Sequence, residues 1–182
     1  REVAGKPLIA HTVGHALEAG IFDVVAASSD STAILEAARA AGAHELVERP
    51  AALASDTAPK VPAIRHAVHT VEQRLGVRFE VCCDLDATAP LRSADDVRRA
   101  VALLEERGVK NVFSVVPARR SPYFNLVEVG ADGVARLSKT LEAPVFRRQD
   151  APACFDMNAS IYVWRRDALE LSDTVFLDDT AA

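Results

Sequence analysis

The stretch Phe79-Glu80-Val81-Cys82-Cys83-Asp84-Leu85 decides the fold class of this chain. It is a short, nearly continuous apolar run, which is typical of a strand buried on both faces of a sheet. A helical pattern follows over residues 95–107, and another buried run follows over residues 112–116. Two buried strands joined by a helix predict a βαβ unit, in which the strands lie parallel in one sheet.

The residues before this stretch repeat the alternation of helix and strand. We expect helices over residues 7–20, 31–41 and 61–75, and short strands over residues 22–27 and 46–47. Pro7 suits a first helical turn because its missing N–H needs no partner there, and Gly20 is a common C-terminal cap. The alternation predicts an α/β protein with three layers, α/β/α, and a mainly parallel sheet covered on both faces.

The pattern changes between residues 117 and 152. Two β-rich runs, 124–129 and 134–137, flank Gly130-Ala131-Asp132-Gly133, which predicts a β-hairpin. We expect this small antiparallel insertion to contribute a contact in a homodimer or a lid over the substrate. A last strand follows over residues 160–164, so residues 1–182 are expected to form a single domain.

The composition is that of a chain that buries its own core, with 182 residues of which 49% are hydrophobic. Lys and Arg total 21 against 26 Asp and Glu, for a net charge of -5. The cations are spread along the chain, which argues against nucleic-acid binding. The apolar runs are far shorter than the ~20 residues of a membrane span. We therefore expect a cytoplasmic protein with no membrane or nucleic-acid partner and three reduced cysteines.

Ligands of a parallel α/β sheet bind beyond the carboxyl ends of its strands. This rule singles out Ser28 and Asp30 after one expected strand, and the loop that follows Leu85. Arg49 and Lys60 supply cations near the start of the next helix, where unpaired backbone N–H groups already favour an anion. The alternative is a loop that caps the helix and carries solvated charges.

The loop Leu85-Asp86-Ala87-Thr88-Ala89-Pro90-Leu91-Arg92 follows the central strand. Thr88 offers a hydroxyl, and Arg92 can bind a phosphate or carboxylate through two parallel hydrogen bonds. Because Asp84 and Asp86 lie at the end of a strand, we expect only one of them to face the pocket. The alternative for Asp86 is that it caps the loop by accepting bonds from local backbone N–H groups.

Two later segments carry polar side chains that suit a sugar. Arg147-Arg148-Gln149 supplies two cations and an amide, and Asn158-Ala159-Ser160-Ile161-Tyr162 places an amide and a phenol at the start of the last strand. Such groups can recognise sugar hydroxyls or an N-acyl group through their donors and acceptors. The alternative for the arginine pair is a solvated surface.

Taken in order, these segments resemble the acylneuraminate cytidylyltransferase family, which comprises the CMP-sialic acid synthetases and their legionaminic and pseudaminic acid relatives. The resemblance spans nearly the whole chain and rests on the order and spacing of the segments. The segments are Gly5-Lys6-Pro7-Leu8-Ile9, Ser28-Ser29-Asp30-Ser31, Arg49-Pro50, Leu53-Ala54-Ser55-Asp56-Thr57, the loop LDATAPLR, Arg148-Gln149 and Asn158-Ala159-Ser160-Ile161-Tyr162.

The resemblance implies a Rossmann-like nucleotide-binding domain and a Mg²⁺-dependent reaction. In that reaction CMP passes from CTP to the anomeric hydroxyl of a nonulosonic acid, and pyrophosphate is released. By motif position, Arg92 and Arg148 would be catalytic. The resemblance further implies that the nucleotide is bound by Ser28, Asp30, Arg49 and Lys60. The sugar acid would be bound by Asp86, Thr88, Ala89, Arg92, Gln149, Asn158, Ser160 and Tyr162.

Three departures limit this transfer of roles. The family's phosphate-gripping loop would lie before Arg1, and its metal-binding aspartates beyond Ala182, so no metal ligand is assigned. The family's usual LQPTSPLR reads LDATAPLR here, with Asp86 in place of Gln and Ala89 in place of Ser. These changes alter the hydrogen bonds offered to the sugar, so a relative of sialic acid is at least as strong a candidate. A Kdo cytidylyltransferase and a non-catalytic nucleotide-binding module are the alternatives.

Overall fold

A computed structural model describes all residues of the chain, 1–182. The chain divides into two compact units. The first comprises Arg1–Ser114 together with Ala159–Ala182, and the second comprises Val115–Asn158. The second unit encloses the insertion that the sequence places at residues 117–152.

Four α-helices belong to the first unit. They are α1 (Leu8–Ala19), α2 (Thr32–Ala40), α3 (Lys60–Leu75) and α4 (Ala94–Arg107). α1 ends at Gly20, whose φ of 66° is a left-handed conformation that glycine adopts without strain. α4 begins with a capping box, in which Ser93 Oγ accepts from the Asp96 N–H and the Asp96 carboxylate accepts from the Ser93 N–H. No helix has the length and apolarity needed to cross a membrane.

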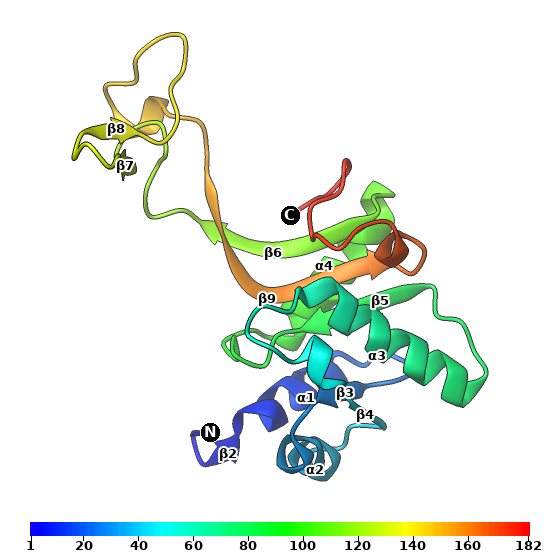
Figure 1. Cartoon of the computed structure of the whole chain (residues 1–182). Coiled ribbons are helices and arrows are strands. Elements are labelled where there is room, and N and C mark those ends of the chain that lie inside the picture. The colour runs from blue at the N-terminus through cyan, green and yellow to red at the C-terminus, as the bar shows by residue number, and fades with distance from the viewer. The chain divides into compact units, whose positions relative to one another are not determined.

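The strands of the first unit form three separate sheets. They are β1 (Glu2–Val3), β2 (Lys6–Pro7), β3 (Ala26–Ser29), β4 (Glu45–Glu48), β5 (Val81–Leu85), β6 (Asn111–Pro117) and β9 (Phe155–Arg165). β1 pairs with β2 in a short antiparallel hairpin, and β3 pairs with β4 in parallel. β9 lies between β5 and β6, and the three long strands are neighbours in Figure 1. β9 runs antiparallel to β5, with Leu85 opposite Ile161.

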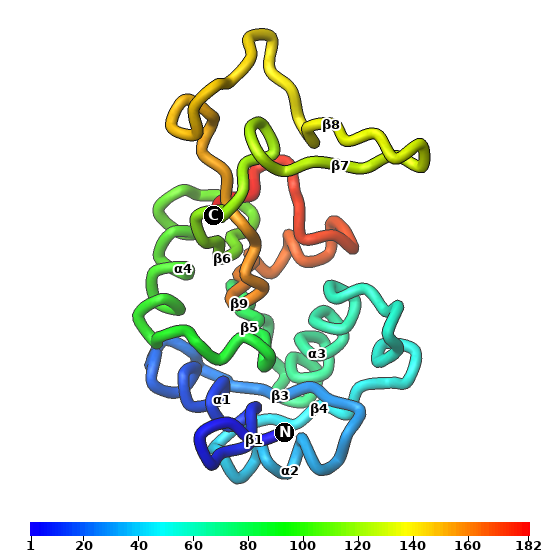
Figure 2. Tube along the Cα trace, turned by 90° about the vertical axis from the view of Figure 1, so that its left-hand side faces the viewer, coloured from blue at the N-terminus to red at the C-terminus, as the bar shows by residue number.

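Two apolar clusters hold these layers together. One joins α4 to β9 through Val97, Leu104, Ile161 and Val163, which are buried. The other joins α1, α2 and β3. Leu85 at the end of β5 contacts both clusters, so the end of β5 lies where the two cores meet. Figure 2 shows β5 and β9 between α4 on one side and α3 on the other, which is the expected three-layer order.

A buried ion pair ties α3 to the segment that follows β9. Arg166, which is 4% exposed, donates from Nε and Nη2 to the two carboxylate oxygens of Glu72, at 2.8 and 2.9 Å. Its Nη1 donates to Glu170 Oε1 at 2.6 Å. Two parallel bonds to one carboxylate fix both direction and distance. The pair therefore orients α3, whose first residue is Lys60.

The second unit contains a small hairpin. β7 (Val127–Val129) and β8 (Ala135–Leu137) pair antiparallel, and Gly133 in their turn has a φ of 74°. A short 3₁₀ helix, η2, covers Arg148–Asp150, while η1 (Ala51–Leu53) and η3 (Ala168–Glu170) belong to the first unit. The hairpin expected from the sequence is confirmed, with shorter strands.

The structure confirms the α/β class and corrects three details. The sheet formed by β5, β9 and β6 is less parallel than expected, because β9 lies between the other two strands and runs antiparallel to β5. β3 begins at Ala26 rather than at Phe22. The Phe22 side chain instead packs against both apolar clusters. Pro7 directly precedes α1 instead of occupying its first turn, with a φ of -53° that suits the chain entering a helix.

Candidate active site at the carboxyl end of strand β5

The loop Asp86–Arg92, here called the β5 loop, leaves β5 where the two cores meet. Asp86 Oδ1 accepts from the backbone N–H of Thr88 at 2.9 Å and from its hydroxyl at 2.6 Å. This is the loop-capping role that was the alternative for Asp86. It fixes the direction of Thr88 at the start of the loop, where the Thr88 side chain stays exposed.

Both aspartates at this strand end contact the same cation. Lys60 Nζ lies 2.7 Å from Asp84 Oδ2 and 3.2 Å from Asp86 Oδ2. The expectation that only one of the two carboxylates faces the pocket is wrong, because residues i and i+2 of a strand point to the same face. Lys60 Nζ also lies 4.6 Å from the centre of the Tyr162 ring, a cation–π distance.

The charges in this cluster reinforce one another. Burial lowers the pKa of Lys60, but Asp84 and Asp86 outweigh it and leave that pKa above its usual value. Burial raises the pKa of Asp86, yet the hydrogen bonds from Thr88 and the charge of Lys60 bring it below its usual value. Lys60 is therefore an ammonium and Asp86 a carboxylate at neutral pH. The two carboxyl groups thus share the Lys60 ammonium as an ion-pair partner.

Arg92 is buried, with 8% of its surface exposed. Its guanidinium donates to the Thr12 hydroxyl on α1 at 2.8 Å, to the Asp86 carbonyl, and to the carbonyl and hydroxyl of Ser160 on β9. Burial lowers the pKa of Arg92, and Asp86 raises it. The side chain that the sequence offered to a phosphate or carboxylate is thus engaged by protein oxygens from a helix, a loop and a strand. Its contact with a substrate stays a prediction.

β9 also contributes residues to this candidate site. The Ser160 carbonyl accepts from the Asp86 backbone N–H at 3.1 Å as well as from Arg92. Ala159, directly before Ser160, has a φ of 50°. A left-handed conformation costs a residue with a Cβ about 1–2 kcal/mol. Strained residues of this kind cluster at functional sites, because surrounding structure must hold them in place.

Arg49 contacts the end of the parallel pair β3–β4. Its Nε donates to the Ser28 hydroxyl at 3.2 Å, and its Nη2 donates to the Ser28 carbonyl at 2.8 Å. Unlike Lys60, this half-buried cation forms no ion pair within the chain. A fixed guanidinium with a free charge is well suited to an anion. The structure thus brings together Ser28 and Arg49, and it leaves Asp30 exposed beyond β3.

Three of the site residues expected from the sequence belong to the second unit. Arg148 donates to the carbonyls of Ala118 and Arg119, at 3.3 and 2.9 Å, and Gln149 is exposed in η2. Asn158 is the last residue of this unit. The part of these three residues in the site stays a prediction.

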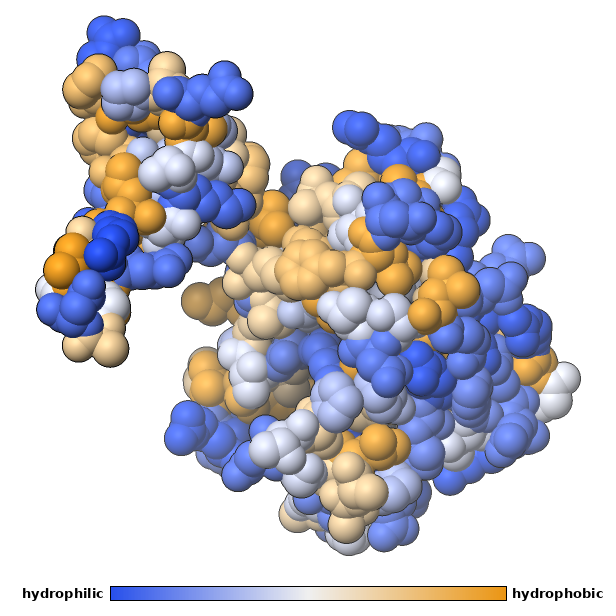
Figure 3. All heavy atoms as spheres, turned by 45° about the horizontal axis from the view of Figure 1, so that its top comes forward, coloured by the Kyte–Doolittle hydropathy of each residue, from blue (hydrophilic) through white to orange (hydrophobic).

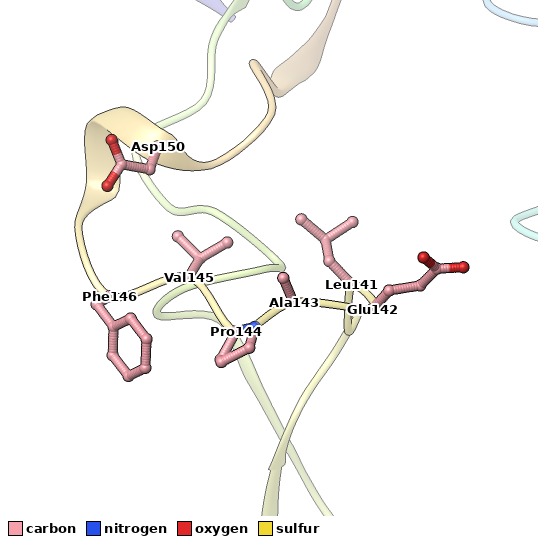
Figure 4. Close-up of a pocket in the computed structure, with 7 residues that line it drawn as sticks. All are labelled: Leu141, Glu142, Ala143, Pro144, Val145, Phe146 and Asp150. Atoms are coloured by element: carbon pink, nitrogen blue, oxygen red, sulfur yellow. The ribbon is translucent and has the colours of Figure 1, made fainter.

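An open hollow in the second unit is not a good candidate for the site. It is lined by one loop and the last residue of η2, and Figure 4 shows these side chains: Leu141, Glu142, Ala143, Pro144, Val145, Phe146 and Asp150. A ligand site needs polar groups that converge from several elements. Figure 4 shows the two carboxylates at opposite ends of the row, with Phe146 pointing away from it.

A magnesium ion finds no complete ligand set in these residues. No group of three or more His, Cys, Asp or Glu side chains gathers anywhere in the structure. The carboxyl groups of Asp84 and Asp86 are both paired with Lys60 and offer no third protein ligand. The residues present do not fit the ion by themselves, so no chemical step is assigned to one.

Thr12 is a functional candidate that the sequence did not reveal, and Asp84 was considered only as the alternative to Asp86. Asp84 belongs to the apolar run of the central strand, but its i, i+2 spacing from Asp86 was a usable signal for a shared face. Thr12 lies on the buried face of α1, eighty residues before its partner Arg92, and no local pattern could have paired the two.

Comparisons with known proteins identify the family of this chain. The model of a family described as cytidylyltransferase matches residues 1–180. Post-translational flagellin modification protein B of Campylobacter coli is 39% identical over 180 residues, which are 99% of this chain and 75% of that protein. CMP-N,N'-diacetyllegionaminic acid synthase of Campylobacter jejuni shows the same identity and the same coverage.

The fold is also shared with a solved enzyme of related chemistry. The structure of CMP:2-keto-3-deoxy-manno-octonic acid synthetase complexed with CTP superposes with a TM-score of 0.63 at 18% identity, covering 93% of this chain and 68% of that one. At this identity the likeness shows the α/β fold alone.

Proposed function

The chain belongs to the cytidylyltransferase family, and we propose that it transfers CMP from CTP to the anomeric hydroxyl of a nonulosonic acid. The observation that carries the proposal is the family match over residues 1–180 together with a loop of polar groups at the carboxyl end of β5. Ligands of α/β sheets bind at this end of the strands.

The reaction exchanges one phosphorus–oxygen bond for another. The anomeric oxygen of the sugar acid forms a bond to the α-phosphorus of CTP, the bond to the β-phosphate oxygen breaks, and pyrophosphate leaves with that electron pair. The hydroxyl proton passes to solvent or to a base. Catalysis of such a transfer rests on positioning the two reactants and on offsetting the charge of the phosphates.

The residues of this chain divide these two tasks. Arg49, held by Ser28 and without an ion pair, is the cation best placed to offset phosphate charge. The β5 loop offers the Thr88 hydroxyl, whose direction Asp86 fixes, to the sugar acid. Mg²⁺ would supply further charge neutralisation, as it does for phosphoryl groups generally.

The sugar acid is best sought among the relatives of sialic acid. Asp86 stands where the family commonly has Gln, so a carboxylate that only accepts hydrogen bonds replaces an amide that also donates them. A sugar that presents N–H or O–H donors to this loop would suit the exchange. A diacetylated nonulosonic acid fits this requirement. One of the 39% identical relatives is named as the synthase of the CMP derivative of such a sugar, N,N'-diacetyllegionaminic acid.

A panel of sugars tests the proposal. The protein is incubated with CTP, Mg²⁺ and either legionaminic, pseudaminic or N-acetylneuraminic acid, with the eight-carbon acid Kdo as a further arm, and pyrophosphate release is measured. Release with at least one nine-carbon sugar is expected. Release with Kdo alone would replace the proposed substrate, and no release with any sugar would favour a non-catalytic nucleotide-binding role.

We also propose that the second unit contributes to a homodimer and that the protein acts in the cytoplasm. The second unit exposes large apolar side chains, among them Val129 at 65% and Phe146 at 81%. Figure 3 shows apolar and polar residues mixed over its surface. Exposed apolar residues in such a small unit favour burial against another protein surface. The cytoplasmic location is supported by three cysteines that are free of disulfides.

A further inference from the structure

Lys60 occupies a place that is electrostatically unfavourable for a cation. It is the first residue of α3, and the amino end of a helix carries a partial positive charge that repels an ammonium. Three groups from two strands offset this repulsion: Asp84 and Asp86 of the β5 end, and the ring of Tyr162 on β9. The Lys60 ammonium is therefore engaged by side chains of the protein itself.

The two carboxylates depend on Lys60 as much as it depends on them. Asp84 and Asp86 point to the same face, and like charges this close disfavour each other's ionisation. Asp84 Oδ2 is buried, and the ion pair that Asp84 forms is with Lys60. Without the ammonium, the Asp86 side chain would be pushed away from Asp84. That shift would disturb the two hydrogen bonds from Thr88 to Asp86.

We propose that Lys60 and Asp84 are positioning residues for the β5 loop. Asp84 holds the Lys60 ammonium, Lys60 holds the Asp86 carboxylate, and Asp86 orients Thr88. In this account Lys60 acts through Asp86, rather than by touching the phosphates of CTP, the contact that the family resemblance implies. The proposal rests on the proposed function in one respect, namely that the β5 loop binds the sugar acid.

Five variants distinguish a positioning role of Lys60 from a direct contact with the phosphates. Lys60→Met leaves two facing carboxylates, Asp84→Asn leaves Lys60 paired with Asp86, and the double variant leaves a single carboxylate with nothing to repel it. Lys60→Arg keeps a cation in the cluster and is the conservative control. Lys60→Gln is a second polar replacement in case Lys60→Met does not fold, which urea unfolding followed by the fluorescence of Trp164 would reveal.

The first measurement needs no turnover. Hydrogen exchange of the Thr88 backbone amide, followed by NMR, reports its bond to Asp86. We expect Lys60→Met to speed this exchange by about tenfold and the double variant to return it to within about threefold of wild type.

The second measurement is steady-state kinetics with CTP and the accepted sugar acid. Lys60→Met should raise the KM for the sugar by about tenfold and leave the KM for CTP within about twofold, with recovery in the double variant. An increase in the KM for CTP that Asp84→Asn does not reverse would assign Lys60 to the phosphates and overturn the proposal. Hydrogen exchange of the Thr88 amide that is equally fast in Lys60→Met and in the double variant would also overturn the proposal. If wild type releases no pyrophosphate with any sugar, the proposed function fails, whereas the exchange pattern still decides whether Lys60 positions the loop.

Discussion

Replacement of Arg92 tests whether this residue supports the site from within the fold. Arg92→Met keeps much of the length of the side chain and removes every hydrogen-bond donor. Three oxygen-bearing residues lose a donor: Thr12 on α1, Asp86 in the β5 loop and Ser160 on β9. These partners come from three elements that are distant in sequence, so the guanidinium joins the helix, the loop and the strand.

The size of the effect follows from these bonds. A hydrogen bond to a charged group contributes about 1.5–3 kcal/mol, so three partners at the lower value give about 4.5 kcal/mol. Part of this is offset, because a buried cation is costly to desolvate and Arg92 forms no direct ion pair within the chain. We expect Arg92→Met to lower the free energy of unfolding by about 2–4 kcal/mol. Arg92→Lys should lose about half as much, since one ammonium cannot reach all three partners.

Urea unfolding measures this loss. Trp164 is the single tryptophan, 1% exposed and stacked on Tyr162 in β9, so its fluorescence follows the part of the fold that Arg92 supports. Arg99→Met is the matched control, because Arg99 on α4 is exposed and should matter by less than about 0.5 kcal/mol. An Arg92→Met protein as stable as the control would refute the reasoning. If that protein were also inactive, Arg92 would belong to the substrate contacts that the family resemblance implies.

Three further predictions concern the ion pair, the metal and the oligomer. The hydrogen bonds from Arg166 hold the pKa of Glu72 below its usual value of 4.5. The Glu72 carboxylate therefore stabilises the fold above pH 4.5. This contribution is lost as the pH falls through the lowered pKa of the folded state. Glu72→Gln should therefore cost about 2 kcal/mol or more at pH 7 and progressively less as the pH is lowered below 4.5, as urea unfolding over a series of pH values would show; a cost that does not fall with pH would contradict the assignment. EDTA should abolish pyrophosphate release and added Mg²⁺ should restore it, while release that persists in EDTA would exclude a metal requirement. Light scattering should give the mass of a dimer, and the double variant Val129→Asp, Phe146→Asp should shift it toward a monomer; a monomeric wild type would exclude the proposed homodimer.

The sequence by itself determined the fold class and the reaction class. Buried runs such as residues 79–85, and the helical patterns between them, are local properties of the chain, because the choice between strand and helix follows from the spacing of apolar side chains. The resemblance of the ordered segments to a cytidylyltransferase family was equally accessible, and the family match over residues 1–180 confirms it. The LDATAPLR loop was found in the same way.

Tertiary structure decided what the charged residues in and beside that loop do. The sequence offered Arg92 and Lys60 to the substrate, because a cation near a strand end is a reasonable ligand for an anion. The fold gives Arg92 its partners Thr12 and Ser160, and it gives Lys60 the shared carboxylates of Asp84 and Asp86. Only folding brings these groups together from distant parts of the chain, and their hydrogen bonds and ion pairs depend on that proximity. The sequence therefore proposed a candidate site, and the packing of α1, α3, β5 and β9 determined which of its cations are already engaged by the protein.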